Sequence, residues 1–235
     1  MGNICSREVK APPLSEISIP IEEKAIQESE KDLLFTGCQA KDSLAYIKSC
    51  STSGRLSVFQ LKKVFRQLNL DHSLVTDEDS TSFKILRLFQ TGSAQYQTRI
   101  VAFLALLLGQ GTVTEKTEEL FEFFDEDASQ TFSREETFTM LEDMVELSAI
   151  KIPEAAVIDG KMLQEEKQRY TNKLLEAKDD FVQDFVLALM GNNQEISHKE
   201  FLGAFVSNPD FQRLLWTTGI RANLLRKSKL YGLFS

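Results

Sequence analysis

The most constraining feature of the sequence is one twelve-residue segment, Asp125–Glu136, which reads D-E-D-A-S-Q-T-F-S-R-E-E. Oxygen-bearing groups recur in it at the first, third, fifth, seventh, ninth and twelfth positions, the spacing of a loop that wraps Ca²⁺. The predicted ligands are the side chains of Asp125, Asp127, Ser129, Ser133 (through water) and Glu136, and the carbonyl of Thr131. Apolar residues at helical spacing flank the segment: Leu120, Phe121 and Phe124 before it, and Phe138, Leu141 and Val145 after it. The segment therefore predicts a helix–loop–helix calcium site.

The sixth position of this loop carries Gln130, where the sharp turn normally requires glycine at positive φ. A side chain in that conformation costs roughly 1–2 kcal/mol, which weakens binding about ten-fold. Between Glu115 and Glu146 there are twelve acidic and two basic residues, and this field favours a divalent cation. The sequence predicts one bound Ca²⁺ at most. A loop that has kept its shape and lost its metal is the alternative.

The N-terminus, Met-Gly-Asn-Ile-Cys-Ser, fits the myristoylation pattern M-G-x-x-x-[ST], with Gly2 as the acceptor. A single myristoyl chain binds a membrane only marginally, with K on the order of 10⁴ M⁻¹, so a second signal is needed. Palmitoylation of Cys5 would supply it. We therefore expect a lipid-anchored protein at the cytoplasmic face of a membrane. A chance match with an ordinary exposed cysteine is the alternative.

Composition excludes several other classes of protein. The chain has 27 basic and 35 acidic residues, and a formal charge of −8 argues against a nucleic-acid partner. No nucleophile, phosphate-loop or zinc motif occurs, so we do not expect an enzyme. The longest apolar stretch, Ile100–Gly109, is about half the ~20 residues that span a bilayer, which predicts a core helix.

Together the loop and the N-terminus resemble the neuronal calcium sensor branch of the EF-hand superfamily, with the recoverin-like and calcineurin-B-like proteins. That family combines an acylated start with four EF-hands in two pairs, the first of them spoiled by a cysteine. Residues 45–65 look like the spoiled hand, with Cys50 and Gly54-Arg55-Leu56 near the family's Cys-Pro-x-Gly-x-Leu. With Leu56 as eighth position, this loop spans Ser49–Gln60 and contains no carboxylate.

Two more segments resemble degenerate hands. Phe89–Ile100 contains no acid, although the second hand is usually functional in the family. In Phe185–Phe205, placing Ile196 at the eighth position puts Leu189 first and Glu200 twelfth, so we expect that loop to be empty or shifted in register. The long connection before it, about residues 150–180, is expected to hold an inserted or lengthened helix; a solvated spacer is the alternative.

The resemblance implies an all-α fold of two EF-hand pairs, with short β-bridges between paired loops. The expected divisions are an acylated flexible tether (1–31), a degenerate N-terminal pair (32–112), a C-terminal pair with the insertion (113–216) and a basic, apolar tail (217–235). For the tail, three states remain open: a plug in a groove, a membrane contact, or a frayed end.

The resemblance further implies a membrane-tethered calcium sensor or adaptor that binds an amphipathic helix of a partner in a hydrophobic groove. The alternative is a calcium-independent scaffold bound permanently to its partner. Residues that could line the groove or fill the core are Phe59, Leu61, Phe65, Phe83, Leu86, Phe89, Phe103 and Leu107.

Overall fold

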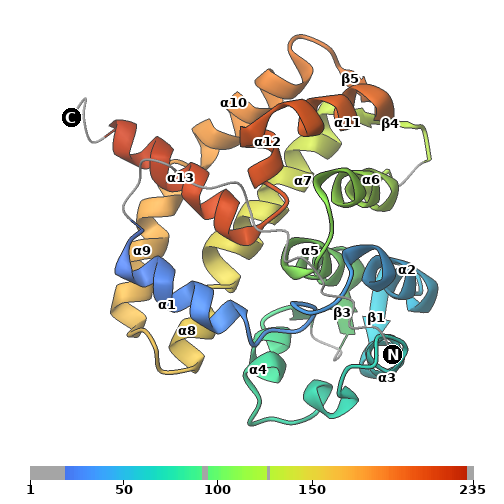
Figure 1. Cartoon of the computed structure of the whole chain (residues 1–235), viewed down its shortest axis with the longest axis vertical. Helices are drawn as coiled ribbons and strands as arrows, with labels where there is room; N and C mark the ends of the chain where they lie inside the picture. The colour runs from blue at the N-terminus through green and yellow to red at the C-terminus, as the bar shows by residue number, and fades with distance from the viewer. Residues whose placement is uncertain (1–18, 92–94, 126–127, 232–235) are drawn as a thin grey trace, which may run out of the picture.

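The computed structural model describes residues 19–91, 95–125 and 128–231, most of which are helical (Figure 1). Within this part of the chain, four segments consist of two helices joined by one short strand or, in the second segment, by two. They are α2 (Ala40–Cys50), β1 (Arg55–Ser57) and α3 (Val58–Gln67); α4 (Thr81–Arg87), β2 (Gln90–Thr91), β3 (Gln95–Gln97) and α5 (Thr98–Leu108); α6 (Val113–Phe124), β4 (Thr131–Ser133) and α7 (Arg134–Glu146); and α10 (Lys178–Met190), β5 (Glu195–Ser197) and α11 (His198–Ser207). A short 3₁₀ turn, η1 (His72–Val75), lies between the first two.

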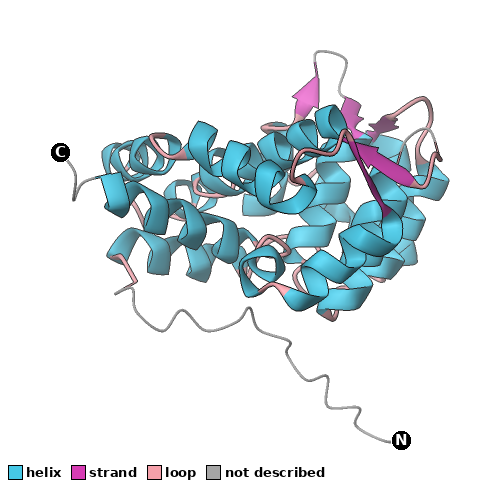
Figure 2. Cartoon of the chain, turned by 90° about the horizontal axis from the view of Figure 1, so that it is seen from above, coloured by secondary structure: helices cyan, strands magenta, loops and turns pink. Residues whose placement is uncertain are grey.

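Two small antiparallel sheets connect these segments in pairs. One has the strand order β1-β3-β2 with Leu56 opposite Tyr96, and the other pairs β4 with β5 with Phe132 opposite Ile196. Figure 2 shows the strands gathered toward one end of the molecule, with helices alone at the other. Phe132, the eighth residue of the Asp125–Glu136 segment, thus lies opposite a residue of the fourth segment.

The connection between the third and fourth segments is helical, as expected for an insertion. Helix α7 continues into a π-helical turn, η2 (Leu147–Lys151), and Pro153 then begins the short helix α8 (Glu154–Ile158). Helix α9 (Gln164–Leu175) follows and packs against η2, α10 and α13. The insertion is therefore part of the packed structure and is not a solvated spacer.

Helices lie at both ends of the described chain. The prediction of a flexible tether over 1–31 is wrong for α1 (Ile21–Glu30), whose Ile26 is fully buried. Of the three states left open for the tail over 217–235, the frayed end is wrong for α13 (Thr217–Tyr231), which follows α12 (Pro209–Arg213) and buries Ile220, Leu224 and Leu225. An apolar face at helical spacing explains α13, and the buried charges described below explain α1.

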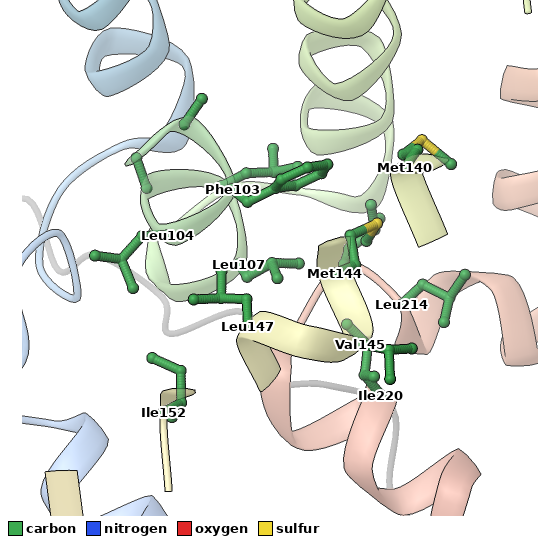
Figure 3. Packing of buried hydrophobic residues seen from close by; sticks show 14 of the residues in the cluster. Phe103, Leu104, Leu107, Met140, Met144, Val145, Leu147, Ile152, Leu214 and Ile220 are labelled. Carbon is green, nitrogen blue, oxygen red and sulfur yellow. The ribbon is translucent and has the colours of Figure 1, made fainter. Parts of the chain in front are cut away.

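One continuous cluster of buried apolar side chains runs through all four segments. Figure 3 shows its centre, where Phe103, Leu104 and Leu107 of α5 lie near Met144 and Leu147 of α7 and η2. The predicted core helix at Ile100–Gly109 is confirmed by α5, which is buried from Val101 to Leu107.

The fourth loop is shorter than the twelve-residue count implied. Helix α10 runs to Met190 and ends at Gly191, with φ 56°, so Leu189 lies inside a helix and is buried. Four residues separate α10 from β5, whereas six separate α6 from β4. Placing Leu189 at the start of a loop is therefore wrong, although Ile196 keeps its expected pairing.

Candidate metal centre

The Asp125–Glu136 loop begins where α6 ends, because Asp125 is the residue that caps the helix. The flanking apolar residues lie as predicted, with Leu120, Phe121, Leu141 and Val145 buried. Of the six predicted ligands, Asp127 lies outside the described residues. The other five can be placed, and they fall into two hydrogen-bonded groups.

The first group is built on the carboxylate of Asp125. Its Oδ1 accepts hydrogen bonds from the backbone N–H of Ser129 at 3.0 Å and from Ser129 Oγ at 3.3 Å. Its Oδ2 accepts one from the backbone N–H of Gln130 at 3.0 Å, and Ser129 Oγ also lies 2.9 Å from the carbonyl oxygen of Thr131. The first and fifth positions of the loop thus meet at one carboxylate, and the hydroxyl of Ser129 connects the seventh position to them.

The backbone at Gln130 has φ 61°, which confirms the left-handed conformation predicted for the sixth position. Ala128 has φ 55° as well, which no sequence pattern indicated, because alanine seldom adopts that conformation. Each such residue costs roughly 1–2 kcal/mol. The hydrogen bonds to Asp125 hold the loop in this shape despite the cost.

The second group is a capping box at the start of α7. The carboxylate of Glu136 accepts hydrogen bonds from the backbone N–H of Ser133 at 2.8 Å and from Ser133 Oγ at 2.6 Å, while Ser133 Oγ accepts one from the N–H of Glu136 at 3.2 Å. The same arrangement occurs at Ser57 with Gln60 and at Ser197 with Glu200. Glu136 can therefore act as a helix cap without a metal.

These donor types fit Ca²⁺, which prefers carboxylate, hydroxyl and carbonyl oxygens. For chelation the carboxylate of Glu136 would have to turn from its own helix terminus toward the group around Asp125. Among the described residues, which exclude Glu126 and Asp127, no three His, Cys, Asp or Glu side chains gather closely enough to hold a metal ion.

A buried ion cluster ties the two chain ends together, and the sequence interpretation missed it. Arg221 of α13 is fully buried; its Nε and Nη2 donate to the two carboxylate oxygens of Glu23 at 2.8 and 2.9 Å, and its Nη1 donates to Glu30 at 2.9 Å. Tyr170 Oη donates to Glu23 at 2.6 Å, and Thr217 Oγ1 donates to Glu30 at 2.5 Å.

The cluster explains why an acidic helix is packed inside the protein. Burial opposes ionisation of Glu23, but the charge of Arg221 and the hydrogen bonds that Glu23 accepts hold its pKa below the usual value. Burial likewise opposes the charge of Arg221, yet the two glutamates raise its pKa further. One sequence signal was available: Glu23, Ile26 and Glu30 recur at i, i+3 and i+7, which places both glutamates on the buried face of α1.

A second buried cation lies on α6, the helix that enters the candidate loop. Lys116 is fully buried, and its Nζ donates to the carbonyl oxygen of Leu215 at 3.0 Å and lies 4.7 Å from the ring centroid of Trp216. Burial lowers the pKa of Lys116 to about 7. Protonation of this group near neutral pH therefore changes the charge inside the third segment.

The groove expected among the first two segments is filled. Leu61, Phe65, Leu86, Phe89, Phe103 and Leu107 all belong to the buried core, which leaves only Phe59 exposed and Phe83 half-buried. A pocket of about 410 Å³ lies instead between α10, α12 and α13. Its apolar lining comes from Phe181, Phe185 and Phe211, and the ion pairs Lys227–Asp184 and Arg226–Asp210 stand at its rim.

No protein-family model matches this chain, and no curated protein shows significant similarity to it. Over the residues that the structure describes, no helix has the length and apolar character that crossing a membrane requires. The predicted lipidation sites, Gly2 and Cys5, lie outside the described residues.

Proposed function

We propose that this chain is a membrane-tethered EF-hand protein that binds one Ca²⁺ at Asp125–Glu136 and a helical segment of a partner protein. The strand pairing supports the assignment of two EF-hand pairs. Leu56 faces Tyr96 and Phe132 faces Ile196, which are the residues at the eighth position of each loop when the loops are aligned. Paired loops of this kind allow each unit to bury its apolar face. The proposal includes neither catalysis nor nucleic-acid binding.

The observation that carries the calcium assignment is the convergence on Asp125. The loop holds positive φ at Ala128 and Gln130, and it directs two backbone N–H groups at one carboxylate. The resulting strain of a few kcal/mol is typical of functional loops. The first loop also holds positive φ, at Ser53 and Gly54, but it has no carboxylate to accept such hydrogen bonds.

Calcium titration calorimetry on chelator-treated protein tests the assignment. We expect one site at most, with Kd of about 10⁻⁵ M or weaker, since the site has three carboxylates and a strained turn. Glu136→Gln should abolish the binding heat, because an amide can replace the carboxylate in the capping box, as Gln60 does in α3, but cannot give a bidentate carboxylate. Glu200→Gln is the matched control and should leave the heat unchanged. No heat from the parent protein would refute the site.

The pocket between α10, α12 and α13 supports the partner assignment. Its volume of about 410 Å³ is at the small end of the usual range of ligand pockets. Three phenylalanines can receive one large apolar side chain of a docked helix, and the charged rim can fix its direction. Phe185→Asp would then abolish partner binding, while Leu187→Asp, at an exposed position on the same helix, would retain it.

Lipid anchoring at the cytoplasmic face of a membrane is tested by fractionation. Gly2→Ala should move the protein from the membrane to the soluble fraction, and Cys5→Ser should leave a weaker, reversible attachment, because one acyl chain binds only marginally. A Gly2→Ala protein that stays fully on the membrane would remove acylation as the anchor.

A second candidate function is a calcium-independent scaffold. The specific observation in its favour is that Glu136 forms the same capping box as Gln60 and Glu200, which belong to loops without a ligand set. The scaffold replaces the sensor if the parent protein gives no calcium heat and still binds its partner in chelator.

A further inference from the structure

The first helix–strand–helix segment contains a long acid-free stretch of sequence in an otherwise acidic chain. Residues 43–70 contain no Asp or Glu and five basic residues, whereas the whole chain has a net charge of −8. The loop of this segment has lost every carboxylate that a calcium site needs. The loss of metal ligands therefore leaves a positively charged region.

Helix α3 presents this charge together with an exposed aromatic ring. Phe59 is 73% exposed, and Lys63 and Arg66 are exposed at i+4 and i+7 from it, with Lys62 half-buried beside them. This spacing puts the four side chains on one stripe of the helix. Within the described residues none of the three cations pairs with a carboxylate, although eleven such pairs occur elsewhere.

Two features of the surface around this stripe argue against a peptide ligand. Phe59 does not line the pocket between α10, α12 and α13, the one between Leu88 and Lys151, or the one beside Glu135 and Glu136. The neighbouring edge of β1 is already used, because Arg55 exchanges backbone hydrogen bonds with Thr52 and the N–H of Ser57 donates to Gln60. Strand addition at this edge is therefore disfavoured.

We propose that this stripe, Phe59 with Lys62, Lys63 and Arg66, binds the surface of an anionic lipid bilayer independently of calcium. Basic side chains are attracted to anionic headgroups, and one projecting aromatic ring can enter the interface without a preformed groove. The rest of the chain is net negative, which favours an orientation that turns the stripe toward such a membrane.

The inference rests on the proposed membrane tether and deepens it, because it adds a contact of the folded chain to the acylated N-terminus. The eighteen residues before the described chain span at most about 60 Å when extended. On this proposal, an acyl chain on Gly2 and the α3 stripe bind the same membrane.

The test uses the Gly2→Ala full-length protein, which cannot be myristoylated. Any membrane binding that it shows comes from the folded chain, so the result for the stripe does not depend on whether the proposed lipid anchor exists. Binding is measured by co-flotation with vesicles of phosphatidylcholine containing phosphatidylserine, and with phosphatidylcholine alone, in calcium and in chelator. We expect binding only to the anionic vesicles, equal in both buffers and reduced by salt.

Two sets of variants assign the binding to the stripe. Lys62→Gln/Lys63→Gln/Arg66→Gln should weaken binding roughly 100-fold, at about five-fold per lost cation. Phe59→Ala should weaken it about ten-fold. The matched controls are Arg169→Gln/Lys173→Gln/Lys199→Gln, three exposed cations elsewhere, and Leu163→Ala, which is 68% exposed on the insertion.

Insertion of the ring is read separately by Phe59→Trp with brominated lipid, which should quench its emission more than that of Trp216 in the parent. Circular dichroism excludes unfolding of the variants. The proposal is overturned if the triple variant floats like its parent. It is also overturned if Phe59 variants bind normally and heparin binds as tightly as vesicles. The basic residues would then form a surface that binds any polyanion, without insertion of a side chain into a bilayer.

Discussion

The half of the molecule built from α2 to α5 encloses apolar side chains, whereas the half built from α6 to α13, with α1, also encloses ionised ones. Every charged residue that is buried in the described structure belongs to the second half: Glu23, Glu30, Lys116, Lys167 and Arg221. The first half buries only Ser43, Ser82 and Thr98 among polar residues. Consecutive segments can close a core by hydrophobic pairing alone. The second half contains an insertion and both described chain ends, and buried ion pairs fix how these additional helices meet.

The largest test of this difference is Arg221→Met. Removing the guanidinium leaves Glu23 and Glu30 buried without their partner, which typically costs about 3–5 kcal/mol. Urea unfolding at neutral pH measures the loss. Arg99→Met is the control, because Arg99 pairs with Asp143 but is 39% exposed, and an exposed pair is worth less than about 1 kcal/mol.

Adding Glu23→Gln and Glu30→Gln to Arg221→Met should restore much of the stability, because amides can accept the hydrogen bonds from Tyr170 and Thr217 without a charge.

The stabilisation by Glu23 in the parent protein should depend on pH. Since the pKa of Glu23 is lowered on folding, its contribution is complete above the ordinary carboxyl pKa of 4.5 and is lost as pH falls below it. A loss from Arg221→Met no larger than that from Arg99→Met would contradict the comparison.

Lys116→Met makes the second half resemble the first by removing a buried cation. The pKa of Lys116 is about 7 in the folded chain and about 10.4 when unfolded. Between about pH 7 and about pH 10.4 Lys116 is protonated in the unfolded chain but neutral in the folded chain, so the free energy of unfolding rises with pH over this range. The destabilisation caused by Lys116 is therefore greatest below pH 7 and disappears toward pH 10. The variant should be more stable by about 2 kcal/mol at pH 6, with a smaller gain at pH 10.

Lys41→Met removes an exposed cation of the first half and should show no such dependence on pH. Unfolding curves of the three proteins at a series of pH values provide the measurement. An advantage of Lys116→Met that stays constant from pH 6 to pH 10 would show that its cause is packing and not charge.

Gln130→Gly copies into the third loop the glycine that the first loop has at the same place. Gly54 and Gln130 have φ 70° and 61°, and each directly precedes its strand. Relief of about 1–2 kcal/mol of strain should tighten calcium binding about ten-fold in calorimetry. Gly54→Gln, the reverse change, should cost about 1 kcal/mol of stability without affecting calcium. Unchanged affinity would mean that the turn does not limit binding.

The smallest effects distinguish capping from chelation. Without calcium, Ser57→Ala, Ser133→Ala and Ser197→Ala should each cost about 1 kcal/mol, because each serine caps a helix in the same way. Glu136→Gln and Glu200→Gln should stay within about 0.5 kcal/mol. With calcium, only Glu136→Gln should lose the added stability that bound metal gives. An equal loss from Glu200→Gln would place metal in the fourth loop.

Much of the local structure follows from the sequence because its causes are local. Apolar spacing predicted α6, α7 and the buried helix α5, and the resemblance implied the short strands that connect the loops. The oxygen pattern predicted that Asp125, Ser129 and Thr131 would lie together, and the spacing of the turn predicted positive φ at Gln130. Helix periodicity and strand pairing act over a few residues, so that one sequence is sufficient to read them.

Only the tertiary structure decided the parts that depend on distant partners. Glu23 and Glu30 follow the pattern of a solvated acidic helix until Arg221, some two hundred residues away, neutralises them inside the core. The expected groove residues became core because the other segments cover them, and Phe59 alone remained outside. A charge can be buried only where an opposite charge and hydrogen bonds meet it, and the position of that partner is a property of the whole fold.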